Sequence, residues 1–312
     1  MAMGMWSPKA LLHEAILLQN QLALLLRERE RSLPSSEVYN SKWEDWICSE
    51  SDCRTKCIAY CFFNLHSIAY DTPPIMLTSE MKIDLPQSAE IWGAATATEW
   101  QVMQEKSPPT PVSFQSALNS LFAAPTHEEQ QPISSLGNYA LIQAIIQQIY
   151  LARQASRTGA LLTGTSNLGS EEIGMFERAL KVWQIGWERT PESSLDPVNP
   201  YGPVAFSSTA LLRLAYIRLH CDLGPHRGLD TREPQVIAGA LEAAPKVVRG
   251  PHVSRVVIHA AHALSIPVKI GINYVAHTQT LLWSMQHALV NLECAYLLSR
   301  SPVSKILLVL TP

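Results

Sequence analysis

The sequence predicts an all-α fold, a multi-helix globular bundle, on three observations. Apolar residues recur every three or four positions along most of the chain, which is the period of a helix with a buried face. No segment shows the strict alternation of apolar and polar residues that is typical of a half-buried strand. Prolines and glycines cluster between the helical stretches, as connections between packed helices require.

We expect the helices to form one domain over residues 1–312, because a chain of this length can bury a large core. The stretch 158–170 is rich in glycine, threonine and serine. It is therefore a candidate break between two subdomains.

The first predicted helix covers residues 11–26 and is amphipathic. Polar residues interrupt its apolar run, so the segment is neither a signal peptide nor a membrane span. A mixed-charge stretch, 27–31, follows it as a solvated end. The face expected to be buried consists of Leu11, Leu12, Ala15, Ile16, Leu18, Leu22, Leu25 and Leu26.

The second predicted helix begins at Trp43, where two acidic residues in the first turn suit the exposed N–H groups of a helix start. It ends before Pro73, because proline lacks a backbone donor and forces the preceding residue out of helical geometry. Its apolar residues cover more than one face, so we expect it to be the central helix of the domain. An extended segment to Pro86 and a helix carrying Ile91, Trp92 and Trp100 come next.

The remaining helices follow from the same apolar periodicity and from the prolines and glycines between them. Their expected ranges are 112–122, 136–153, 171–188, 204–222, 235–244, 252–264 and 273–299.

The composition argues against direct contact with nucleic acid. Hydrophobic residues make up 47% of the chain and charged residues only 16%, against about 25% charged residues in an average soluble protein. The formal net charge is −3, whereas binding to phosphates depends on lysine and arginine. We therefore expect no direct nucleic-acid partner.

The six cysteines have neither the close pairs of a zinc site nor the pattern of a small secreted framework. We interpret them as compact buried side chains in a reducing, intracellular compartment, either the cytoplasm or the nucleus. They are Cys48, Cys53, Cys57, Cys61, Cys221 and Cys294.

Motifs for the common cofactors are missing from the sequence. It contains no glycine-rich dinucleotide loop, no phosphate loop, no His-Glu-x-x-His and no nucleophile elbow. His259 and His262 could share a helix face, but without a third ligand we interpret them as core or surface histidines. We expect no cofactor and no metal.

Two blocks of residues together resemble one known family. The first reads Trp43-x-x-Trp46-Ile47-x-x-Glu50-Ser51, then Arg54, Phe62, Asp71-x-Pro73-Pro74, Leu85-Pro86 and Ile91-Trp92. The second reads Ile266-Pro267-Val268-x-x-Gly271-Ile272, then His277-Thr278-Gln279, Trp283-Ser284-x-Gln286-His287 and Leu292-Glu293. In order and spacing they resemble the regulatory domain of fungal-specific transcription factors, the middle homology region that is attached to zinc-finger activators.

This resemblance covers roughly a third of the chain and implies a helical regulatory domain, standing alone here without the zinc-finger DNA-binding part. The chain departs from the family pattern on the second predicted helix. Fewer basic residues follow the Glu-Ser pair, and Phe63 and Asn64 stand where the family carries an acid. An ionic contact between helices is therefore expected to be lost.

If the two blocks face each other, they would wall an apolar cavity with a few hydrogen-bonding groups, the usual form of a small-molecule site. The candidate catalytic donors are His66, Tyr60, Tyr70, His277 and His287. The candidate substrate-binding residues are Phe62, Phe63, Trp92, Asn273, Tyr274 and Trp283. The alternative for all of them is packing between helices.

Two functions remain open. The chain could be a non-DNA-binding regulator or interaction module. It could instead bind a hydrophobic terpenoid or polyketide in fungal secondary metabolism and promote a cofactor-free cyclisation of the pericyclic, Diels-Alder type, which needs shape, orientation and one or two hydrogen bonds. The low charge and the altered polar pattern favour the second by a small margin, with a homodimer as a candidate assembly.

Overall fold

The computed structural model describes residues 9–32, 42–106, 111–123, 132–163, 168–196, 199–223, 226–244, 251–271, 273, 275, 277 and 285–300. Within this part of the chain, every regular secondary-structure element is a helix. The β-pairing there is limited to one isolated bridge between Asp84 and Ser113. The predicted all-α class is therefore confirmed.

The elements follow one another along the chain as α2 (Lys9–Ser32), α3 (Trp43–Tyr70), the short 3-10 helix η1 (Thr78–Glu80), α4 (Ala89–Trp92), α5 (Ala97–Lys106), α6 (Phe114–Phe122), α7 (Ser135–Thr163), α8 (Ser170–Arg189), α9 (Val204–His220), α10 (Pro234–Ala243), α11 (Pro251–Ile270) and α13 (Met285–Arg300).

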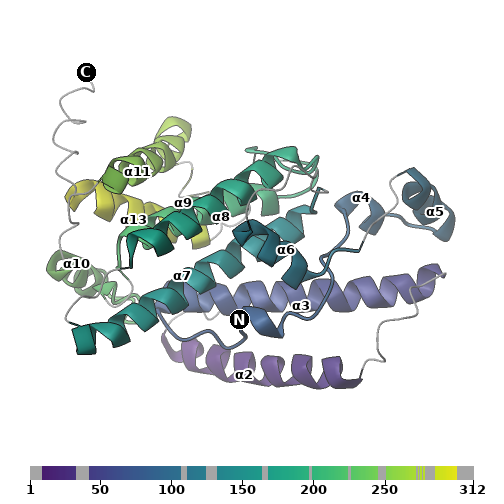
Figure 1. The fold of residues 1–312 in the computed structure, drawn as a ribbon, viewed down its shortest axis with the longest axis horizontal. Coiled ribbons are helices and arrows are strands. Elements are labelled where there is room, and N and C mark those ends of the chain that lie inside the picture. Colours follow the sequence, from purple (N-terminus) through teal and green to yellow (C-terminus); the bar gives the residue numbers. More distant parts are fainter. Residues whose placement is uncertain are drawn as a thin grey trace.

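The centre of the bundle is formed by α7 and α9, which pack against each other (Figure 1). Helix α7 also contacts α3, α6 and α8, and α9 also contacts α8, α11 and α13. Residues 140–147 of α7 are buried without interruption. The expectation that α3 would be central was therefore wrong. Helix α3 flanks α7 and lies between it and α2 (Figure 1). The Ile58 side chain of α3 remains exposed.

Helix α3 has the predicted bounds because its ends have strong local signals. It begins at Trp43 with Glu44 and Asp45 in its first turn, and it ends at Tyr70. Asp71 then adopts a left-handed conformation with φ of 55°, which aspartate tolerates better than most residues. The two prolines that follow cannot extend the helix.

Two short helices replace the single helix expected around Ile91, Trp92 and Trp100. The Ser88 hydroxyl accepts a hydrogen bond from the N–H of Ile91 at 3.4 Å and caps α4. The Thr96 hydroxyl accepts one from the N–H of Glu99 at 3.3 Å and so begins α5. Each cap satisfies a donor that a continuous helix would pair internally, and the chain therefore turns at Gly93.

Two later helices run beyond their predicted ends. Helix α7 continues through part of the glycine- and threonine-rich stretch to Thr163. Helix α11 continues past Leu264 to Ile270, with Pro267 inside it. Because Pro267 lies in the last turn and is buried, it removes only one hydrogen bond near a helix end, and packing outweighs that loss.

Helix α2 does not bury the whole face that the sequence predicts. It turns Ala15, Gln19 and Ala23 inward, whereas Leu18 and Leu25 point to solvent with Ile16 also exposed. Side-chain contacts between α2 and the segment after α3 hold this orientation. Arg27 donates to Glu80 Oε2 at 2.6 Å and to the carbonyl of Ile75 at 2.8 Å.

A buried carboxylate on α13 connects the first and last parts of the fold. Glu293 Oε1 accepts hydrogen bonds from Arg218 at 2.7 Å and from Arg227 at 2.8 Å. Both arginines also donate to the carbonyl of Ile68 in the last turn of α3, at 2.7 Å each. Cations at a helix C-terminus satisfy its free carbonyls. Burial would raise the pKa of Glu293, but the two arginines outweigh it and hold the pKa below its usual value.

A second buried carboxylate, Glu192, fixes two helix starts. Its Oε1 accepts from the N–H of Ala89 at 2.6 Å, and its Oε2 accepts from the N–H of Ser135 at 2.7 Å. These donors open α4 and α7, where the helix dipoles favour a negative charge.

We expect Glu192→Gln to lower the free energy of unfolding by about 1–2 kcal/mol, because the amide has only one acceptor oxygen for two buried N–H groups. Denaturant titration measures the change. The matched control is Glu188→Gln, an exposed glutamate on α8 that accepts a hydrogen bond from Gln184. Equal stabilities of the two variants would contradict this account.

Candidate functional site

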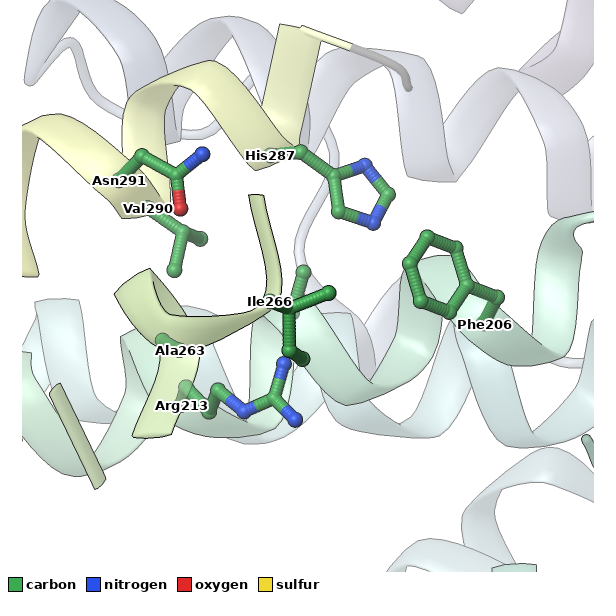
Figure 2. Close-up of a pocket in the computed structure, with 8 residues that line it drawn as sticks. Phe206, Arg213, Ala263, Ile266, His287, Val290 and Asn291 are labelled. Atoms are coloured by element: carbon green, nitrogen blue, oxygen red, sulfur yellow. The ribbon is translucent and has the colours of Figure 1, made fainter. Parts of the chain in front are cut away.

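A small pocket lies where α9, α11 and α13 meet (Figure 2). Its lining is apolar apart from one cation, one imidazole and one amide. The lining residues are Phe206, Ala210 and Arg213 of α9, Ala263 and Ile266 of α11, and His287, Val290 and Asn291 of α13. The cavity volume is about 10 Å³, which is close to the space that one water molecule needs.

His287 and Phe206 form one wall of this pocket. Their rings stack with centroids 4.8 Å apart and an interplanar angle of 19°. Figure 2 shows the imidazole of His287 reaching from α13 toward Phe206 on α9. Both residues are buried, so this aromatic pair closes the pocket at that side. Of the predicted donors, His287 is the one that lines this pocket.

Arg213 supplies the pocket's positive charge. Its guanidinium lies below Ile266 (Figure 2). Burial lowers the pKa of Arg213, and the nearby Cys294 opposes that shift. Among the residues that the structure describes, no carboxylate pairs with Arg213. Because Arg213 is half-buried and lines the pocket, its guanidinium can donate to an acceptor oxygen of a bound ligand.

The sequence argument missed Arg213. The available signal was a single arginine inside the apolar run 210–217 of α9. Arginine in such a stretch is rarely fully buried unless it has a partner. It could therefore have been singled out as a candidate binding residue.

Two of the candidates on α3, Tyr60 and Phe63, lie in the main core and away from the pocket lining. Tyr60 packs edge-on against Phe114 with centroids 5.8 Å apart. Burial raises the pKa of Tyr60. Phe62 is half-buried on the same helix. These positions fit the packing alternative that the sequence left open.

The other two candidates on α3 lie at its C-terminal end. His66 is buried and packs edge-on against Tyr70 at 6.0 Å between centroids. The hydroxyl of Tyr70 accepts a hydrogen bond from Arg232 at 3.1 Å. Neither residue lines the α9–α11–α13 pocket.

Trp92 belongs to a separate aromatic cluster near α4 and α5. Its ring centroid is 6.2 Å from that of Trp46, and the guanidinium of Arg54 lies 4.6 Å above it. Trp46 also packs against Trp100 at 5.5 Å. Trp92 keeps 39% of its surface exposed, so it covers this cluster from the solvent side.

The remaining candidates fall in the segment before α13. Asn273 and His277 are exposed. Tyr274 and Trp283 lie outside the described residues. The candidate set therefore does not converge on the pocket in the described part of the chain, and ligand contact by these residues stays a prediction.

Polar contacts do bring parts of the two family-like blocks together. Arg218 and Arg227 link Glu293 on α13 to the carbonyl of Ile68 at the end of α3. Gln286 on α13 accepts a hydrogen bond from the Tyr139 hydroxyl of α7 at 2.6 Å. Helices α3 and α13 thus approach each other through α7 and α9.

Over the described residues, no cluster of three or more His, Cys, Asp or Glu side chains could hold a metal ion. His259 stacks on Tyr216 with centroids 4.7 Å apart and an interplanar angle of 8°. The six cysteines are free thiols; four are buried as expected, whereas Cys48 is exposed and Cys53 is half-buried. Cys53 donates to the carbonyl of Asp84 at 3.1 Å. None of the helices in the described ranges has both the length and the apolar character that a membrane span needs.

Comparison with known proteins gives one family match. Residues 222–300, about a quarter of the chain, match the model of the fungal transcription factor C-terminal domain. The match confirms the resemblance inferred from the sequence and supports a fungal transcription factor regulatory-type domain. It includes the second block and the pocket residues of α11 and α13. No curated protein and no solved structure matched the chain.

Proposed function

We propose that this chain, which carries a fungal transcription factor-like domain, is a regulatory module that responds to a small molecule in the α9–α11–α13 pocket. The observation that carries the proposal is Arg213, a cation without an acid partner in the described residues, inside a pocket built largely by the matched segment. A carbonyl or carboxylate oxygen would complete its hydrogen bonding.

Binding in this pocket would act on the centre of the fold. Helix α9 contributes Phe206 and Arg213 to the pocket and packs against α7 along its other side. The water-sized volume means that a larger ligand must displace the wall formed by Phe206 and His287. A ligand that binds only the displaced arrangement shifts the protein toward it, which is what a regulatory domain requires.

The proposed module acts on genes through another DNA-binding segment or protein. Its formal charge of −3 offers little attraction for phosphates. The free thiols of its six cysteines fit a reducing, intracellular location, which we propose together with this role.

The test joins the whole chain to an unrelated sequence-specific DNA-binding domain and measures a reporter gene in fungal cells. We expect the fusion to change expression several-fold relative to the DNA-binding domain alone. Arg213→Met should abolish the part of the response that depends on ligand. The matched control is Arg178→Met, at an exposed position on α8. A wild-type fusion without effect would contradict the regulatory role.

A second candidate function is cofactor-free cyclisation of a hydrophobic terpenoid or polyketide. It is favoured by the combination of Arg213, His287 and Asn291 with otherwise apolar walls. In an intramolecular Diels-Alder closure, two carbon–carbon bonds form from π electrons and no group leaves. Donors on a carbonyl oxygen of the dienophile would accelerate that closure. Ligand pockets usually measure about 300–1,000 Å³, so either function requires displacement of the Phe206–His287 wall, and we rank regulation first because of the family match.

Incubation with a linear triene tethered to an unsaturated carbonyl separates the two functions. A cyclase would give one stereoisomer faster than buffer does, and Arg213→Met would lose the acceleration. A regulator would leave the rate at the buffer value. Specific DNA binding by the isolated chain in a gel-shift assay would rule out the cyclase and would also contradict our expectation of no nucleic-acid contact.

A further inference from the structure

The buried guanidinium of Arg227 uses only part of its hydrogen-bonding capacity within the protein. Its Nη1 donates to the carbonyl of Ile68 at 2.7 Å and to Glu293 Oε1 at 2.8 Å. Its Nε and Nη2 meet no acceptor in the part of the chain that the structure describes. The Arg227 side chain is 1% exposed, so bulk water does not reach these two N–H groups. Buried donors nearly always have a partner, and this pair therefore needs an explanation.

The Nε and Nη2 groups of an arginine lie on the same edge of the planar guanidinium and form a fork that can bind two oxygens at once. Other arginines of this chain place that edge on a carboxylate. Arg27 donates from Nε and Nη2 to the two oxygens of Glu80, and Arg157 donates from the same two atoms to Asp222. In Arg227 the corresponding edge contacts neither an acid nor a carbonyl of the described chain.

The charges around Arg227 favour an anion over a water molecule. Glu293 is shared, because its carboxylate also accepts from Arg218 at 2.7 Å, so two cations contact one acid in the described surroundings. Asp71 also acts on Arg227, but its ion pair, at 3.7 Å, is with Arg157. Burial lowers the pKa of Arg227 to about 10, which leaves the group charged at neutral pH. A water molecule can accept from the fork but cannot balance this charge, whereas a monoanion does both.

The segment that carries Arg227 is suited to local opening. Gly228 and Arg232 have positive φ values of 59° and 58°, and the second is a conformation that a non-glycine residue rarely adopts. Arg232 donates to the Tyr70 hydroxyl at 3.1 Å, which ties this end of the segment to α3. Helix α10, which follows, has no buried residue. Segments with little burial can open without unfolding the rest of a protein, which gives an anion a route to the fork.

We infer that the Nε–Nη2 edge of Arg227 binds the carboxylate of a small molecule at the end of α3, separate from the α9–α11–α13 pocket. A carboxylate is planar and singly charged, so its two oxygens match the fork and its charge balances the second cation beside Glu293. Because Arg227 contacts both α3 and α13, an anion that holds it in place strengthens the connection between these helices. The site does not depend on the proposed function.

Thermal unfolding of the whole chain tests the site, with acetate as the probe. Replacing about 0.2 M sodium chloride by sodium acetate should raise the Tm of the wild type by about 2–4 °C, because a ligand that binds the folded state stabilises it. Arg227→Lys keeps the charge and removes the fork, so most of this shift should be lost. The matched control, Arg178→Lys at an exposed position on α8, should keep the shift and also accounts for the general effect of acetate on proteins.

An NMR titration of the wild-type chain, labelled with ¹⁵N at arginine Nε, observes the fork directly and is informative even if Arg227→Lys does not fold. Acetate should move the assigned Nε–H resonance of Arg227 in a saturable manner, whereas chloride should not, and the resonance of Arg178 should not respond. Movement with inorganic phosphate but not with acetate would overturn the assignment to a carboxylate. An Arg227 resonance that no anion moves would overturn the site.

Discussion

Replacing the buried carboxylate of α13 is expected to produce one of the two largest losses of stability in this fold. Glu293→Gln should lower the free energy of unfolding by about 3–5 kcal/mol, because it leaves Arg218 and Arg227 buried without their counter-charge. Both Glu293 and Arg227 have only 1% of the side chain exposed, so water cannot replace the lost charge. Urea titration at neutral pH measures the change.

The same carboxylate predicts a pH dependence. The pKa of Glu293 is lower in the folded protein than in the unfolded chain. Its contribution is therefore complete above the unfolded value, about 4.3, and is lost as pH falls through the folded pKa. The stability difference between wild type and Glu293→Gln should stay constant from pH 7 to about 5 and then shrink. A difference that grew with acid would contradict this assignment.

A double variant tests the same charge pair even if Glu293→Gln alone does not fold. Glu293→Gln combined with Arg227→Met removes a buried cation together with the anion, so the double variant should be more stable than Glu293→Gln alone. Equal or lower stability of the double variant would show that the charge pair is not the cause.

Trp183→Ala is expected to be similarly damaging. Trp183 of α8 is fully buried in the main core, and its indole N–H donates to the carbonyl of Asn138 at 2.9 Å. Loss of the ring leaves a large cavity and an unpaired carbonyl, for a total of about 3–5 kcal/mol. Trp183→Phe keeps an aromatic ring and loses the N–H donor, so its free energy of unfolding should lie between those of the wild type and Trp183→Ala.

Trp92→Ala is the matched control for this prediction. It removes the same side chain from a half-exposed position over a small cluster, and we expect about 1 kcal/mol, partly from lost contact with Arg54. Chemical denaturation compares the three variants. A larger effect at Trp92 than at Trp183 would contradict the assignment of the main core.

The sequence predicted those parts of the fold whose ends carry local signals. Helix α3 was delimited correctly because acidic residues, a helix-ending aspartate and two prolines act within a few residues of its ends. The sequence predicts too short a helix α11, because a proline such as Pro267 is a local stop signal, whereas tertiary packing keeps the last turn helical. Local signals cannot weigh that packing.

Burial on α2 shows a different limit. Its leucines occur on both sides of the helix, so periodicity alone could not decide which side faces the core. The small residues Ala15 and Ala23 decide it, because they permit close approach to the rest of the bundle. Steric fit between helices determines which face of α2 is buried. A hydrophobicity pattern does not contain that information.

For the candidate site, the sequence found one pocket residue and missed another. His287 was singled out because it falls in the second family-like block. Arg213 was not, because its role depends on the absence of an acid partner in the described surroundings. That is a property of the folded neighbourhood.

The position of Glu293 also has a consequence for biosynthesis. The two guanidinium groups at the end of α3 are bound by a residue from the helix that leaves the ribosome after the other helices described here. A nascent chain that ends before α13 holds uncompensated positive charge and uncovered apolar surface on α9 and α11. Such chains are natural clients of chaperones and proteases, and nonsense mutations late in the gene should therefore abolish the protein instead of shortening it.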